Sequence, residues 1–146
     1  MVRRVARSIA KILEKAEKDV RELIENLPKM IEDAKIRRIV RNLIYFCIEN
    51  GGTPRLSISG REYPTYTLTC MYKTKKFTGV DLTTEGGTLF LVGSEKISTM
   101  EIPHDWFLHF PGKADFVKGF IAELRVEPGS KEDKKIVSLN FNLIPE

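Results

Sequence analysis

The residues best suited to chemistry lie in one short stretch, 100–112, which holds both histidines of the chain, His104 and His109. Histidine and carboxylate side chains are residue types that general acid–base catalysis uses, and Asp105 follows His104 directly, although neighbours in sequence do not face each other. A small hydrolase-type enzyme built around His104, Asp105 and His109 is therefore one hypothesis. Side chains five positions apart point to opposite faces of a strand and lie about 140° apart on a helix, so the two histidines cannot share a metal ion. We predict no metal site and no bound cofactor.

Pro103 and Pro111 enclose the segment 104–110 and favour a strand over a helix there. In that strand Trp106 and Leu108 share one face, and Phe107 and His109 share the other. Trp106 and Leu108 are predicted to face the core. If the reverse face of the sheet is open, Phe107 is an exposed aromatic residue that marks an interface. If both faces of the sheet are covered, Phe107 is a core residue.

The sequence lacks the motifs that would name a reaction. It contains no dinucleotide-binding glycine motif, no phosphate-binding P-loop and no nucleophile elbow. Cys47 and Cys70 have neither a metal-binding spacing nor a CxxC arrangement, and each lies on the apolar face of its predicted element. We interpret both as unpaired cysteines that pack as small core residues. The protein is therefore predicted to act without catalysis.

The positive charge of the chain is concentrated in its first third. Residues 1–50 carry 12 Lys and Arg against 8 Asp and Glu, whereas the remainder is balanced at 12 against 12. Much of this charge is four positions from an acidic residue, as on a solvated helix, but the residues before Glu14 have no such partner. Nucleic acid or an acidic protein would explain them. The candidate nucleic-acid-binding residues are Arg3, Arg4, Arg7, Lys11, Arg37, Arg38, Arg41, Lys73, Lys75 and Lys76.

The hydrophobic periodicity divides the chain into a helical hairpin, 1–50, and a strand-rich half, 51–146, within a single domain. Apolar residues recur at helical spacing over 2–27 and 28–50, and we favour two antiparallel helices that break at 26–28 over one kinked helix. Asn50-Gly51 is expected to end the second helix. From residue 53 the period is two, as in strands, although 113–124 also fits a short helix. The alternation is clearest over 135–144, where Leu139 and Phe141 are expected to face the core and Asn140 to face outward. The predicted fold class is α+β: two N-terminal helices packed on one face of a mostly antiparallel sheet of five to seven strands.

The apolar arc of the first predicted helix is longer than a sheet can cover. Twenty-six residues give a helix of ~39 Å, whereas a strand spans ~17–20 Å. An uncovered end is best buried against a second copy of the chain, and closed dimers are the commonest solution. We therefore predict a homodimer. Its predicted interface residues are Val2, Val5, Ile9 and Ile12, with Phe107 as a further candidate.

The composition indicates a cellular setting. The chain has no Gln, only five Asn, and abundant Lys, Arg and Glu, which is typical of thermophilic proteins. No stretch resembles a signal peptide or a membrane helix, so we expect a cytoplasmic protein without a transmembrane segment. The leading hypothesis is a small non-catalytic binding or assembly protein that forms a homodimer. A nucleic-acid-binding module that uses the basic helix faces is the second hypothesis, and the hydrolase-type enzyme is the third.

Overall fold

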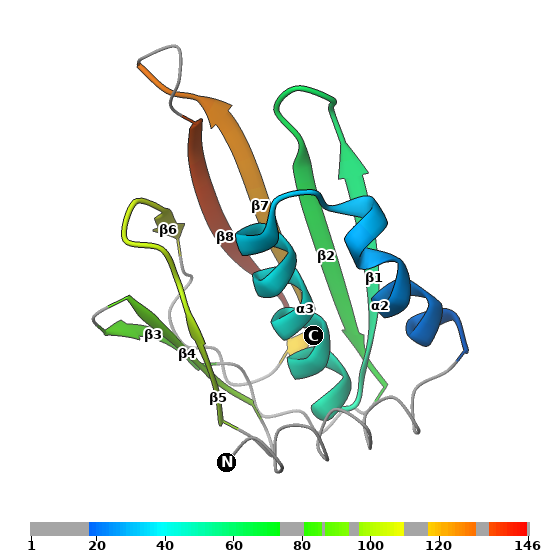
Figure 1. Ribbon diagram of the computed structural model, residues 1–146. Coiled ribbons are helices and arrows are strands. Elements are labelled where there is room, and N and C mark those ends of the chain that lie inside the picture. Colours follow the sequence, from blue (N-terminus) through cyan, green and yellow to red (C-terminus); the bar gives the residue numbers. More distant parts are fainter. Residues whose placement is uncertain are drawn as a thin grey trace, which may run out of the picture.

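The computed structural model describes residues 18–73, 81–85, 87–93, 97–109, 117–130 and 135–145. Within them lie two helices and eight strands, labelled as in Figure 1. The helices are α2 (Lys18–Met30) and α3 (Ala34–Glu49). The strands are β1 (Gly52–Ser59), β2 (Thr65–Tyr72), β3 (Asp81–Glu85), β4 (Thr88–Val92), β5 (Ile97–Glu101), β6 (Phe107–His109), β7 (Val117–Pro128) and β8 (Lys135–Pro145).

The strands form two sheets. The larger has five strands in the order β1-β2-β7-β8-β6, in which only the β6–β8 pair is parallel, and the smaller has the antiparallel order β3-β4-β5. Helices α2 and α3 cover one face of the larger sheet, and the smaller sheet lies on the other side of α3 from α2 (Figure 1). The predicted α+β class is confirmed, whereas the separate three-stranded sheet was not predicted. Residues 117–124 are strand, which supports the strand alternative for that part of 113–124.

The helical region is a hairpin, but its turn lies further along the chain than predicted. Helix α2 runs through Pro28 to Met30, and the helix break falls at 31–33 rather than at 26–28. The break is fixed by Asp33, whose Oδ1 accepts hydrogen bonds from the backbone N–H groups of Lys35 at 2.9 Å and Ile36 at 3.2 Å. This carboxylate satisfies two of the N–H groups that have no intrahelical partner at the start of α3, as an N-cap does.

The hydrophobic core lies between α3 and the covered face of the larger sheet. Phe120 of β7 contacts three aromatic rings, with ring centroids 6.1 Å from Phe46 of α3, 6.2 Å from Tyr72 of β2 and 5.8 Å from Phe141 of β8. The alternation predicted for β8 is confirmed, because Leu139 and Phe141 are fully buried, whereas Asn140 between them is on the outer face and only partly buried. The sheet therefore has one apolar face under the helices and one polar face opposite.

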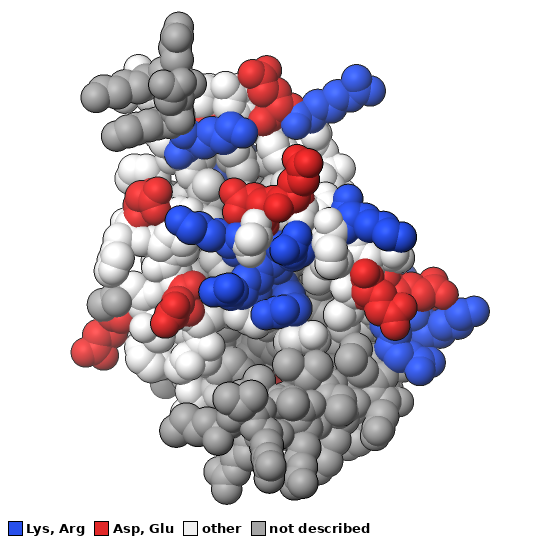
Figure 2. All heavy atoms as spheres, in the orientation of Figure 1, with Lys and Arg blue, Asp and Glu red and all other residues white. Residues whose placement is uncertain are grey.

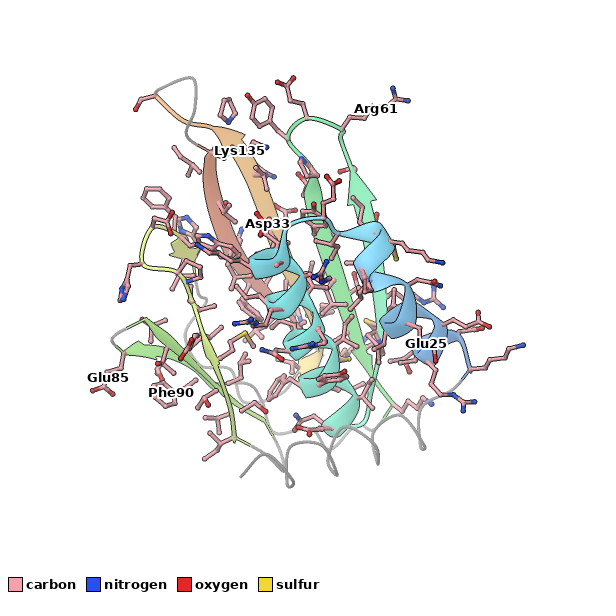
Figure 3. All side chains as sticks on the ribbon, viewed as in Figure 1. Glu25, Asp33, Arg61, Glu85, Phe90 and Lys135 are labelled. Carbon is pink, nitrogen blue, oxygen red and sulfur yellow. A yellow bond between two sulfur atoms is a disulfide. The ribbon has the colours of Figure 1, made fainter. Side chains whose placement is uncertain are left out.

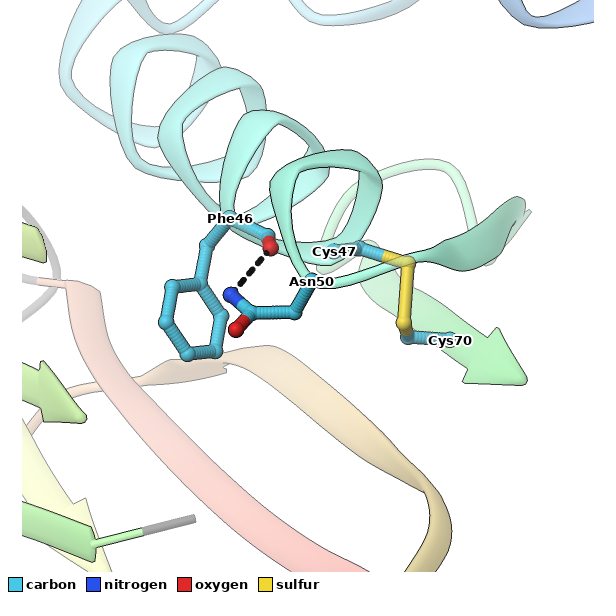
Figure 4. Close-up of a disulfide and its surroundings, with 4 residues drawn as sticks. All are labelled: Phe46, Cys47, Asn50 and Cys70. Atoms are coloured by element: carbon cyan, nitrogen blue, oxygen red, sulfur yellow. Dashed lines mark hydrogen bonds between the residues drawn. A yellow bond between two sulfur atoms is a disulfide. The ribbon is translucent and has the colours of Figure 1, made fainter. Parts of the chain in front are cut away.

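A disulfide joins Cys47, in the last turns of α3, to Cys70 of β2 (Figure 4). The interpretation of these residues as unpaired cysteines was wrong. Both were placed correctly on apolar faces, and those faces meet in the core with the two Cα atoms 5.8 Å apart, within the range that a disulfide spans. Gly52 packs directly against the disulfide, because a Cβ at this position would contact both sulfur atoms.

Candidate functional site

The exposed side of α3 presents three cations in a row, Lys35, Arg38 and Arg41, which we call the α3 basic patch. Their spacing of three residues places them along one side of the helix over about 9 Å. All three side chains are exposed. The space-filling view, in the orientation of Figure 1, shows Lys and Arg side chains gathered over α3 (Figure 2).

The charge of the α3 basic patch is not neutralised within the described part of the chain. No ion pair joins any of its three residues to a carboxylate there. By comparison, Lys18 on α2 has Glu22 at 3.9 Å, one turn along the same helix. The first turn of α3 contains no acidic residue, and the carboxylate that the positive end of the helix dipole favours belongs to the N-cap, Asp33. Exposed cations that have no acidic partner among the described residues are available to an external anionic ligand.

Two neighbours of the patch have a different role. Arg37 is partly buried, and its Nη1 donates a hydrogen bond of 3.2 Å to the backbone oxygen of Ile31, so it closes the α2–α3 turn. Tyr45 follows Arg41 by one turn. Its pKa is raised by partial burial, and the nearby charge of Arg41 opposes that shift. Arg37 and Tyr45 therefore lie beside the patch and are not part of it.

A hollow of about 390 Å³ lies beside the patch, between α3 and the smaller sheet. Lys35 and Arg38 line it from α3, Thr88 and Glu101 line it from the strands, and His104 lines it from the turn after β5. The His104 ring packs against a glycine, since a Cβ on Gly87 would lie 2.8 Å from His104 Cε1. Hydrogen-bond donors from three segments therefore surround one opening, with Glu101 as its only carboxylate among the described residues.

The structure does not bring together the residues of the predicted enzyme. Among the described residues of the predicted strand, 107–109 form β6, and His104 and Asp105 lie in the turn before it. His104 lines the hollow beside α3, whereas His109 lines a different hollow on the outer face of the larger sheet. No hydrogen bond connects either histidine to a carboxylate in the described ranges. Those ranges also hold no cluster of three or more His, Cys, Asp or Glu residues that would bind a metal ion.

Some of the other predicted site residues lie in the described part of the chain, and the rest lie outside it. Phe107 is 56% exposed on the outer face of the larger sheet, so it is not a core residue. Lys73 is exposed at the end of β2. Trp106 and Leu108 are half-buried and pack against the core, as predicted. The residues that lie outside the described part of the chain are Val2, Arg3, Arg4, Val5, Arg7, Ile9, Lys11, Ile12, Lys75 and Lys76.

Two more hollows were not predicted. One of about 410 Å³ on the outer sheet face contains Phe107 and His109 together with polar residues of β7 and β8. The other, of about 850 Å³, lies where the α2–α3 turn faces the ends of the two long hairpins, near Asp33, Arg61 and Lys135 (Figure 3). Its three cations are matched by three carboxylates, so it has no net charge preference. Burial and the nearby carboxylates of Asp33 and Glu32 raise the pKa of its Tyr66.

The chain was compared with protein families, curated proteins and solved structures. No protein family model, no curated protein and no solved structure matches the chain. Neither helix in the described ranges has the length and hydropathy of a membrane-spanning segment.

Proposed function

We propose that the protein is a non-catalytic binding module for a phosphate-rich polyanion, with nucleic acid as the ligand class, and that the α3 basic patch is its contact surface. The observation that supports this most directly is the row of three exposed cations that have no acidic partner in the described part of the chain. Cations that are free of intramolecular partners release counterions from a nucleic-acid backbone when they bind it, and this release drives the association.

The shape and chemistry of the patch suit phosphate. Arg38 and Arg41 each present a planar guanidinium that can bind a phosphate through two parallel hydrogen bonds. Lys35 and Arg38 continue into the hollow that contains His104, which adds a further donor for a phosphate or a sugar oxygen. Contacts of this type position a nucleic acid without reading its bases, so we expect binding with little sequence preference.

The predicted N-terminal cations Arg3, Arg4, Arg7 and Lys11 would extend this surface, and their part in it stays a prediction. Self-association through Val2, Val5, Ile9 and Ile12 also stays a prediction. The disulfide bears on the cellular setting, because disulfides are common in secreted proteins and also in intracellular proteins of hyperthermophiles. The absence of Gln and the abundance of ion-pairing residues favour the second setting. We therefore propose a cytoplasmic protein of a thermophilic organism.

The test removes the patch and measures DNA binding. We expect the triple variant Lys35→Ala, Arg38→Ala, Arg41→Ala to bind a short fluorescein-labelled DNA duplex on the order of tenfold more weakly at low salt, because three phosphate contacts are lost. Fluorescence anisotropy measures the affinity. Because all three residues are exposed, the variant should keep its fold, which circular dichroism verifies.

The matched control is the triple variant Lys18→Ala, Arg21→Ala, Lys29→Ala on α2, which removes the same charge from exposed positions outside the patch. We expect this control to keep most of the affinity. Equal losses in the two variants would show that only net charge matters and would reject the patch as a site. Efficient displacement of the duplex by poly-L-glutamate would instead assign the surface to an acidic protein.

A further inference from the structure

We propose that the protein has a second binding site, for a neutral saccharide, in the hollow on the outer face of the larger sheet. This site goes beyond the proposed polyanion site and lies on the opposite side of the sheet from α3 (Figure 1). Its central residues are Phe107 of β6, Asn140 of β8, and Glu123 and Arg125 of β7.

The strand register brings these residues together. Phe107 is paired with Ser138 and His109 with Asn140 across the parallel β6–β8 ladder. In the antiparallel β7–β8 ladder, Ser138 and Asn140 are paired with Arg125 and Glu123 in turn. The outward side chains of the three strands therefore form two adjacent rows, and these rows line a hollow of about 410 Å³.

The charged residues in this hollow form ion pairs with one another. Arg125 Nη2 lies 3.0 Å from Glu123 Oε1, and its Nη1 lies 4.0 Å from Glu127 Oε1. A guanidinium that already has two carboxylates beside it offers little attraction to a phosphate. The Arg125–Glu123 pair places guanidinium donors beside carboxylate acceptors in the lining of the hollow, and neutral hydroxyl groups can bind to both.

The exposed ring of Phe107 supplies the second element of a saccharide site. It is 56% exposed at the edge of the sheet, where an apolar side chain gains nothing from the core. A pyranose ring has an apolar face of C–H groups and a rim of hydroxyls. Phe107 offers a platform for the face, while Asn140 and Ser138 offer hydrogen bonds for the rim.

The surrounding sheet face fits the same ligand better than a second protein chain. The outward positions of β2 next to the hollow are Thr65 and Thr67, which pair with Arg125 and Glu123, whereas the apolar outward residues Met71, Ile121 and Ile144 lie at the other end of the sheet. The hollow itself contains only Phe107 and Ile136 as apolar residues. A stable protein interface needs an apolar centre, and the hollow, with only these two apolar residues in its lining, does not supply one.

The test measures binding of three neutral oligosaccharides, maltopentaose, cellopentaose and chitopentaose, by isothermal titration calorimetry. We expect at least one of them to bind in the millimolar range or tighter. In Phe107→Ala and in Asn140→Ala the affinity should fall by about tenfold, because the platform or a hydrogen-bonding amide is lost. The control is Met71→Ala, which removes a side chain that is 42% exposed on the same sheet face outside the hollow, and its affinity should be unchanged.

The site is separable from the proposed polyanion surface, because the α3 triple variant should bind the oligosaccharide as the unmodified protein does. Failure of all three oligosaccharides to bind at tens of millimolar would overturn the proposal. It would also be overturned if binding persisted undiminished in Phe107→Ala. Binding of oligo-dT that is lost in Phe107→Ala would reassign the face to single-stranded nucleic acid.

Discussion

Replacement of Cys47 and Cys70 together by alanine is expected to lower the free energy of unfolding by about 3 kcal/mol. The disulfide closes a loop across a sequence separation of 23 residues and joins α3 to β2 through the core. Without it the unfolded chain has more conformations, so folding loses more entropy. Urea denaturation of the double variant and of the oxidised protein measures the difference.

The control for this prediction is the unmodified protein, unfolded in urea with and without dithiothreitol. Reduction should destabilise it in the same direction as the double substitution, since both remove the same link. Two free thiols in the denatured protein without reductant would show that the bond is absent. A double variant as stable as the oxidised protein would show that the bond has no stabilising role.

The second large effect is expected at Gly119, where substitution by alanine should destabilise the protein by about 2–3 kcal/mol. A Cβ at this position would collide with the backbone oxygen of Cys70 and would lie 3.1 Å from the Cα atom of Met71. These atoms belong to the β2 backbone, which is held by its ladder to β7 and by the disulfide, so they cannot move aside.

Thermal or urea denaturation of Gly119→Ala tests this expectation. The matched control is Lys118→Ala, one residue earlier in β7 with an exposed side chain, and it should change the stability by less than about 0.5 kcal/mol. If the two variants were equally stable, the close approach of β7 to β2 at this point would be wrong.

Much of the fold could be predicted because the local hydrophobic pattern decides which face of an element is buried. Leu139 and Phe141 were correctly assigned to the core by alternation alone, and the helical end at Asn50-Gly51 was also predicted. The three-stranded sheet was missed because alternation indicates that a segment is a strand and says nothing of which strand it pairs with. The disulfide was missed for a related reason, since two apolar faces meet only in the folded chain.

The candidate site shows the same division. Arg38 and Arg41 were predicted to lie on the polar face of their helix, and the structure places both there. Lys35 was not among the predicted residues, because it follows Glu32 and Asp33 closely in the chain and no local pattern separates its charge from theirs. Its importance follows from the hollow that it shares with Arg38 and His104. The His104 ring packs against Gly87 in the turn that places it near α3. No local sequence pattern indicates this contact.

The most direct test of the polyanion proposal is the salt dependence of DNA binding. The logarithm of the binding constant should fall linearly with the logarithm of salt concentration, and the slope should be shallower by about 2.7 in the α3 triple variant, because three phosphate contacts each contribute about 0.9. Anisotropy titrations of the same duplex over a series of salt concentrations measure both slopes. A slope that is the same in the two proteins, or no binding by the unmodified protein at low salt, would contradict the proposal.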